Sequence, residues 1–191
     1  MNIGSSKRNV SVSGKVTGVS TTIQSSFKNS QELKNVAVDF NAQLNGTAGV
    51  PTGLTATASA MQMSQLSSTA ISMKGQLTTA TRTTPSGEGT QNSLAASVFE
   101  VSFTLDAKTN CTLQGTRSFF SQDHTQEKAD FSLISSGGKT WATLADLNGT
   151  DKALALPAGS YKIKFNTQVG AQTDPLGDMG SFNYAFSLVA S

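Results

Sequence analysis

Four aspartates in two polar loops are the residues best suited to metal chemistry. Asp174 and Asp178 enclose one loop, and Asp146 and Asp151 enclose the other. Carboxylate oxygens are the ligands that Ca²⁺ prefers, so each loop is a candidate calcium site. Neither loop has the dense alternate-position spacing of an EF-hand, and aspartate also stabilises ordinary turns through its own side chain. The pattern therefore favours turns without a cofactor, with Ca²⁺ as the alternative.

Aromatic side chains are the second group of candidates, because flat rings stack on the apolar faces of sugars. Trp141 is either such a platform or a core residue, and the sequence leaves both interpretations open. Phe119 and Phe120 are adjacent, so strand alternation must turn one ring away from the core, as an exposed contact or a loop anchor. Tyr161 and Tyr184 share the phase of the apolar residues around them, and we expect both to face inward.

Catalytic constellations are missing from the sequence. His124 is the single histidine and Cys111 the single cysteine, so a Ser/His/Asp triad would depend on His124 and no intrachain disulfide is possible. We expect Cys111 to be a buried, inert thiol. No spacing singles out a pair of carboxylates for glycoside hydrolysis, and glycine-rich phosphate motifs are absent. We therefore predict that the protein is not an enzyme and has no catalytic residues.

The charge balance argues against two classes of partner. Fourteen basic and twelve acidic residues give a net charge of +2, which provides no long-range field for nucleic acid. No apolar run approaches about 18 residues, so we expect no insertion into a membrane. The first eight residues also lack the apolar segment of a signal peptide. Two settings follow: a secreted chain whose leader precedes this sequence, or a protein never exported by that route, such as a virion protein.

Strands must position these side chains. Serine and threonine supply 26 and 24 of the 191 residues, and both compete with helical hydrogen bonding. Apolar residues recur at every second position, most strictly in Phe99–Leu105, where four apolar side chains share one face. About ten such segments are expected, at 10–16, 21–23, 36–40, 54–63, 71–77, 99–105, 111–115, 131–133, 141–144, 161–165 and 182–188.

The fold predicted from this spacing is all-β: a two-sheet, antiparallel, jelly-roll-like β-sandwich. Turns are expected at glycine-containing and proline-containing positions such as Asn45-Gly46. Single helical turns are expected at 30–34 and 121–128 only. Glycine inside three strand segments marks a bulge or close packing between elements; these residues are Gly14, Gly75 and Gly115.

The chain reads as one domain over residues 1–191, with a possible subdivision at the polar segment 83–92. Residues 93–191 hold eight of the ten phenylalanines, both tyrosines and the tryptophan. Residues 1–82 have little large apolar material for a core of their own, which favours a loop between sheets over a linker between domains. This aromatic-poor half needs a packing partner, either in the same chain or in a neighbouring subunit.

The second half resembles a known family. The segments Phe99-Glu-Val-Ser-Phe-Thr-Leu-Asp106, Leu156-Pro-Ala-Gly-Ser-Tyr161 and Phe182-Asn-Tyr-Ala-Phe-Ser-Leu188 are similar to the β-sandwich of bacterial pre-peptidase C-terminal domains and of secreted proteins with a PEP-CTERM sorting tail. The resemblance covers roughly residues 96–190. It implies a non-catalytic extracellular domain.

The leading functional prediction is a non-catalytic, extracellular or cell-surface β-sandwich with a structural, adhesive or assembly role. One alternative is a carbohydrate-binding module that uses Trp141. Another is a virion or filament subunit in which a strand such as 10–16 adds to a neighbour's sheet. The expected partners are other protein subunits, including further copies of the chain, or a surface polysaccharide.

Overall fold

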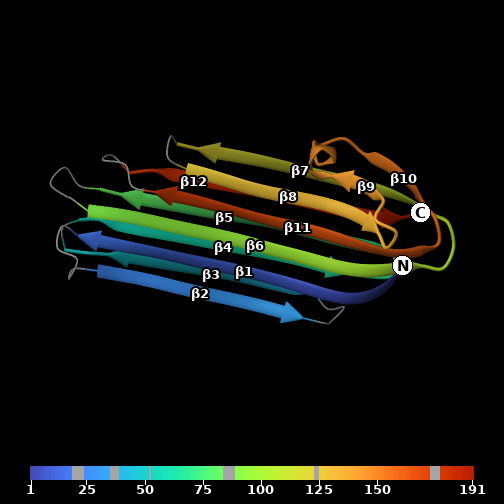
Figure 1. Ribbon diagram of the computed structural model, residues 1–191, viewed down its shortest axis with the longest axis horizontal. Coiled ribbons are helices and arrows are strands. Elements are labelled where there is room, and N and C mark those ends of the chain that lie inside the picture. Colours follow the sequence, from blue (N-terminus) through green and yellow to red (C-terminus); the bar gives the residue numbers. More distant parts are fainter. Residues whose placement is uncertain (19–23, 35–38, 52, 84–88, 123–124, 173–176) are drawn as a thin grey trace.

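The computed structural model describes residues 1–18, 24–34, 39–51, 53–83, 89–122, 125–172 and 177–191. These residues form twelve strands and one short 3-10 helix (Figure 1). In chain order they are β1 (Asn2–Gly18), β2 (Gln24–Lys34), β3 (Phe40–Gly49), β4 (Thr55–Leu66), β5 (Ala70–Arg82), β6 (Gly89–Leu105), β7 (Thr109–Ser121), β8 (Thr125–Ser135), β9 (Thr140–Thr143), η1 (Leu144–Asp146), β10 (Lys152–Leu156), β11 (Gly159–Gln172) and β12 (Met179–Ala190).

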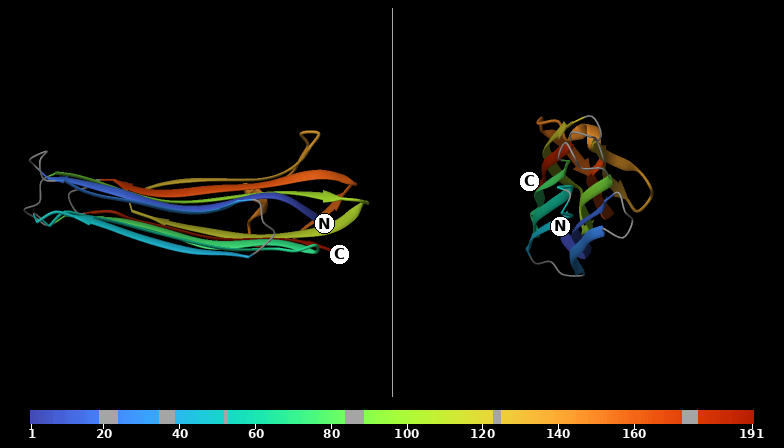
Figure 2. Two further views of the ribbon diagram at one scale, coloured as in Figure 1. Left: turned by 90° about the horizontal axis from the view of Figure 1, so that it is seen from below. Right: turned by 90° about the vertical axis from the view of Figure 1, so that its left-hand side faces the viewer.

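The strands build two six-stranded sheets packed face to face. Sheet A has the order β2-β1-β6-β11-β8-β9, sheet B has the order β10-β7-β12-β5-β4-β3, and neighbouring strands are antiparallel. The molecule is long and narrow, and the two layers separate clearly in side view (Figure 2). The predicted antiparallel sandwich is therefore confirmed, with twelve strands in place of about ten.

Alternation along the strands creates the core. In β6, Phe99, Val101 and Phe103 are almost completely buried, and the residues between them face outward. Tyr161 and Tyr184 also point inward, as predicted, with 4% of each residue exposed. Cys111 is buried as well, and burial raises the pKa of its thiol, which fits the inert cysteine expected from the sequence.

The packing partner of the aromatic-poor half lies within the same chain. In sheet A, β1 pairs with β6 and β2 pairs with β1; in sheet B, β5 pairs with β12. Because β1 has a paired neighbour on both sides, segment 10–16 has no open edge to offer another subunit. The addition of such a strand to a neighbour's sheet stays a prediction.

Three local predictions are wrong. Residues 30–34 belong to β2, where pairing with β1 supplies the backbone hydrogen bonds that a helical turn would have made. Residue 121 ends β7 and residues 125–128 begin β8. Asn45-Gly46, expected as a turn, lies within β3. The predicted strand at 21–23 and the valines of 36–38 lie outside the described residues.

The three mid-strand glycines mark close packing, as the sequence predicted. A β-carbon at Gly14 would collide with the ring of Phe27, one at Gly75 with the hydroxyl of Tyr184, and one at Gly115 with Leu147. Phe27 also lies against Gly46 of β3, so its ring fills the lateral gap where β2 and β3 approach each other. Leu147 fills the opposite side, where η1 crosses from sheet A to sheet B.

Candidate functional site

Trp141 lies on the edge strand β9 and is half-buried. Its ring meets Tyr161 edge-on, with centroids 6.5 Å apart, and the ammonium of Lys139 lies 3.8 Å from the ring centroid. The indole Nε1 is buried and has no hydrogen-bond partner among the described residues. Lys139 therefore lies over one face of the ring and Tyr161 packs against it, and a role of Trp141 in sugar stacking stays a prediction.

Of the adjacent Phe119 and Phe120, one ring points inward and the other outward, as the break in alternation predicted. Phe119 is half-buried and packs against Phe182 with centroids 6.4 Å apart, whereas Phe120 is 52% exposed on the outer face of sheet B. Phe120 pairs with Ser181 near one end of the sandwich, and Trp141 lies on β9 near the opposite end of sheet A. The structure does not bring the three aromatic candidates together.

In the loop between Asp146 and Asp151, both carboxylates form hydrogen bonds within the protein. Asp146 forms an ion pair with Lys152 at 2.7 Å and accepts a hydrogen bond of 2.7 Å from the backbone N–H of Thr143. The hydrogen bond from Lys152, followed by that from Thr143, lowers the pKa of Asp146. Asp151 accepts a hydrogen bond of 2.9 Å from Gln114. This loop has the side-chain bonding of an ordinary turn.

In the loop between Asp174 and Asp178, Asp178 is buried, and its backbone N–H donates to the hydroxyl of Thr81 at 3.1 Å. Asp174 lies outside the described residues. Across the part of the chain that the structure describes, no three His, Cys, Asp or Glu side chains come together as a metal site.

A broad hollow on the outer face of sheet B is the largest candidate site. It encloses about 720 Å³, and a second hollow of about 370 Å³ adjoins it, with Lys74, Thr116 and Ala185 lining both. We call the two together the sheet B trough. Its floor is a row of residues in register across five strands: Asn41, Met63, Lys74, Ala185 and Thr116.

Rows on either side of this floor extend the trough along the strands. One row contains Met61, Gln76, Asn183 and Ser118. The other contains Gln65, Ser72, Ser187 and Gln114. Ala185 is the smallest side chain of the central row, and the trough is hollowed where Ala185 lies between the longer Lys74 and Thr116.

Amides, hydroxyls and thioethers dominate the chemistry of the sheet B trough. The amides of Gln76 and Asn183 make no hydrogen bond with any described residue, so their donors and acceptors are available to a ligand. Lys74 lies at the centre, and Arg117 lines the smaller of the two hollows. Asp39 is the one carboxylate among the described lining residues, and its Oδ2 accepts a hydrogen bond of 3.2 Å from Gln65. Such a surface suits a neutral, polyhydroxylated ligand.

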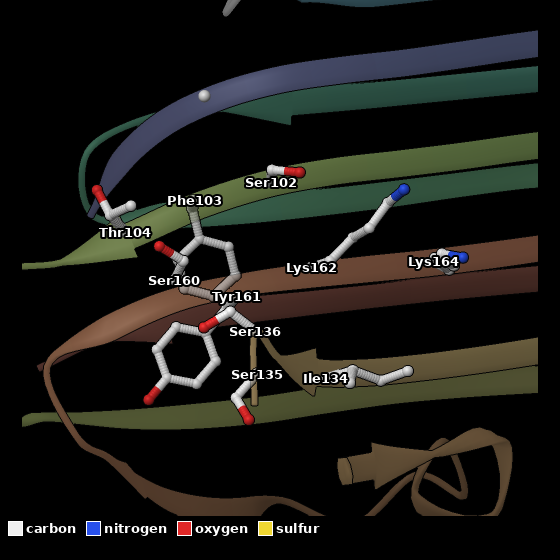
Figure 3. Close-up of a pocket in the computed structure, with 11 residues that line it drawn as sticks. Ser102, Phe103, Thr104, Ile134, Ser135, Ser136, Ser160, Tyr161, Lys162 and Lys164 are labelled. Atoms are coloured by element: carbon white, nitrogen blue, oxygen red, sulfur yellow. The ribbon is translucent and has the colours of Figure 1, made fainter. Parts of the chain in front are cut away.

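A smaller hollow of about 440 Å³ lies on the outer face of sheet A, at the end where β1 begins (Figure 3). Lysine and hydroxyl side chains surround it, among them Lys162, Lys164 and Ser102. The aromatic ring of Tyr161 links this region to Trp141, which itself is not part of the lining.

Sequence reasoning missed both hollows because it looked for acidic loops and aromatic rings. The residues that point outward from the strands carried usable information. The outward residues of β12 are all uncharged, and those of β5 are small or polar except for Lys74 and Arg82. That information identifies a neutral face, but the position of the hollow depends on strand register.

Comparisons with known proteins give no family for this chain. No protein-family model matches it, and neither the curated proteins nor the solved structures contain a match. The resemblance to pre-peptidase C-terminal and PEP-CTERM-sorted domains therefore stays a prediction. Within the described residues, no helix has the length and apolar character needed to cross a bilayer.

Proposed function

We propose that this chain is a non-catalytic, adhesive β-sandwich of the cell surface or extracellular space, which binds a neutral polysaccharide in the sheet B trough. The observation that carries the proposal is the trough itself, a hollow lined mostly by amides, hydroxyls and thioethers, with unpaired amides on the central strands of sheet B. Amide groups donate to and accept from sugar hydroxyls, and the thioethers of Met61 and Met63 supply apolar contact for the C–H faces of a sugar ring.

The carboxylates near the trough support binding without hydrolysis. Glycoside hydrolysis generally needs two carboxyl groups on either side of the scissile bond. Among the described residues that line the trough, Asp39 alone carries one, and it is hydrogen-bonded to Gln65 at one end. The proposal therefore assigns recognition to amides and methionines, and assigns no residue to chemistry.

Affinity electrophoresis through gels that contain neutral polysaccharides such as dextran, mannan or mixed-linkage glucan tests the proposal. We expect at least one of them to retard the wild type, and the double variant Gln76→Ala/Asn183→Ala to bind about tenfold more weakly, because two hydrogen bonds are lost. The matched control is Asn166→Ala/Gln168→Ala, which removes the same two residue types from the outer face of sheet A. Equal affinity of trough variant and wild type would contradict the proposal.

The single tryptophan provides a second readout. Because Trp141 lies outside the trough, its fluorescence should stay unchanged when the trough is occupied. A fluorescence shift that saturates with the polysaccharide would instead support the alternative in which Trp141 is the sugar platform.

A further inference from the structure

The outer face of sheet A differs from that of sheet B in charge. Its strands carry seven lysines and three carboxylates pointing outward, an excess of four positive charges in a chain whose net charge is +2. The lysines are Lys7, Lys15, Lys28, Lys34, Lys128, Lys162 and Lys164, and the acids are Glu32, Glu100 and Asp130.

Four of these charges form a row across the sheet. Lys34 pairs with Lys7, Lys7 with Glu100, and Glu100 with Lys164, in register on four adjacent strands. At about 4.8 Å between strands, the row spans roughly 14 Å. Three ammonium groups and one carboxylate therefore lie within reach of a single extended ligand.

The one carboxylate of this row is neutralised locally. Glu100 forms an ion pair of 2.7 Å with Lys162. This hydrogen bond from Lys162, with further attraction from Lys164 and Lys7, lowers the pKa of Glu100. Lys164 itself forms no ion pair with any described carboxylate, and Lys7 is 4.0 Å from Glu32, at the limit of a pair. Lys34 forms an ion pair of 3.1 Å with Glu32. With Lys162 and Glu32 included, the row and its partners hold four ammonium groups and two carboxylates, so positive charge exceeds negative charge.

Two connected hollows lie over this row. One of about 210 Å³ is lined by Lys7, Lys34 and Glu100, and the hollow of about 440 Å³ in Figure 3 continues from it, with Ser102 and Lys162 lining both. The larger hollow adds the hydroxyls of Thr104, Ser135, Ser136 and Ser160, and no carboxylate is among its lining residues. Phe103, Ile134 and Tyr161 give the same hollow an apolar wall. Ammonium groups beside hydroxyls suit a carboxylate or sulfate carried on a hydroxylated chain.

We propose that these two hollows bind an acidic polysaccharide, with Lys7 and Lys164 contacting its sulfate or carboxylate groups and the hydroxyls of the larger hollow contacting the sugar. The outward residues of the described parts of β2, β1, β6, β11 and β8 include no arginine and no aromatic ring, the side chains that most often hold nucleic acid. On the described strands of the same face, Leu94 is the exposed large apolar side chain, at 37% exposure. One such residue falls short of the continuous apolar face that anchors a protein in a membrane interface.

This second site is independent of the neutral site in the sheet B trough. It is tested with dextran sulfate and with neutral dextran of the same chain length as matched probes, by biolayer interferometry at low and high NaCl. We expect dextran sulfate to bind and to weaken with salt, because ions screen exposed charges. If dextran sulfate binds in a salt-dependent way but the lysine substitutions described next do not weaken that binding, the proposed site is wrong.

The decisive comparison uses two double variants with the same change in net charge. Lys7→Gln/Lys164→Gln should weaken dextran sulfate binding about tenfold, since each exposed charge contact contributes up to about fivefold. Lys15→Gln/Lys128→Gln, on the same face but outside the hollows, should weaken it less than twofold. Equal losses in both variants would show diffuse attraction and overturn the site.

A single substitution supplies an independent check. Ser136 is exposed in the larger hollow, so Ser136→Asp should add a repelling carboxylate there and reduce dextran sulfate binding without altering the fold, as judged by circular dichroism. Unchanged binding would contradict the proposal. Duplex DNA or vesicles with 30% phosphatidylserine serve as competing polyanions. If either binds as tightly and loses affinity in the Lys7/Lys164 variant, the polysaccharide assignment is wrong.

A failure of the proposed sheet A site can be distinguished from a failure of the proposed function of the sheet B trough. The trough variant Gln76→Ala/Asn183→Ala leaves every residue of the sheet A hollows in place. It should bind dextran sulfate like the wild type, even if no neutral polysaccharide binds the protein.

Discussion

At the scale of single residues, a glycine in one strand makes room for a large side chain of the neighbouring strand in the same sheet. The hydroxyl of Tyr184 donates to the backbone carbonyl of Met61 at 3.3 Å, and it does so directly over Gly75. Burial raises the pKa of the Tyr184 hydroxyl far above its usual value, so the group stays protonated and remains a donor. A side chain at Gly75 would remove the space in which this bond forms.

We therefore expect Gly75→Ala to lower the free energy of unfolding by about 1–3 kcal/mol, the usual cost of overpacking a well-filled interior. The control is Gly137→Ala, because a β-carbon at Gly137 has no atom within 4 Å. Urea denaturation followed by circular dichroism measures both variants. A Gly75→Ala protein as stable as the Gly137→Ala protein would disprove this account of the glycine.

At the scale of elements, the sandwich is closed along its sides by single apolar side chains as well as by strands. β9 ends sheet A and β10 ends sheet B, and the chain passes between them through η1. Leu147, directly after η1, is 1% exposed and fits over Gly115, while the N–H of Gly149 donates to the carbonyl of Gly115 at 2.8 Å. One leucine thus seals the gap between the edge strands.

Leu147→Ala should lower the free energy of unfolding by about 3 kcal/mol, because it leaves a cavity at a fully buried site whose rigid surroundings cannot collapse. Leu94→Ala makes the same chemical change at a residue that is 37% exposed, and it should cost less than about 1 kcal/mol. Thermal unfolding by calorimetry separates the two. Similar losses in both variants would mean that Leu147 has no sealing role.

At the scale of the whole molecule, the two halves of the sequence share both sheets. β1 and β2 join strands of the second half in sheet A, and β3, β4 and β5 join them in sheet B. Tyr184 of the second half lies against Gly75 of the first. The side chains of Gln62 on β4 and Ser97 on β6, which also belong to different halves, are hydrogen-bonded at 3.1 Å. Neither half encloses a core without the other.

We expect fragments 1–86 and 87–191 to be unfolded when separate and to regain β structure when mixed, as seen by circular dichroism. The intact chain should unfold in one calorimetric transition, because each sheet needs strands from both fragments. Two resolved transitions, or a fragment that folds alone, would contradict a single cooperative unit and would support a subdivision at 83–92.

The two binding proposals also belong to this scale, because they concern opposite faces. The outer face of sheet B is nearly neutral and that of sheet A is cationic, so the protein presents two different ligand surfaces on one rigid body. If both proposals hold, one molecule could join a neutral polysaccharide to an acidic one.

Local pattern was sufficient for much of the fold. The two-residue periodicity identified which side chains face the core in Phe99–Leu105 and in the strands that contain Tyr161 and Tyr184. This was possible because side chains alternate between the two faces of any strand, whichever strands it pairs with. Mid-strand glycine at Gly75 correctly signalled close packing. Pattern failed for β2, whose polar residues carry no alternation strong enough to identify a strand and whose structure depends on pairing with β1.

The candidate sites were beyond the reach of sequence alone. Lys7, Lys34 and Lys164 are far apart along the chain, and only the register of β2, β1, β6 and β11 places them in one row with Glu100. By itself the sequence determined that strands form and which side chains face inward, because these follow from local geometry and hydrophobicity. Tertiary structure alone decided which outward side chains become neighbours, because hydrogen-bonded register between distant strands sets that arrangement.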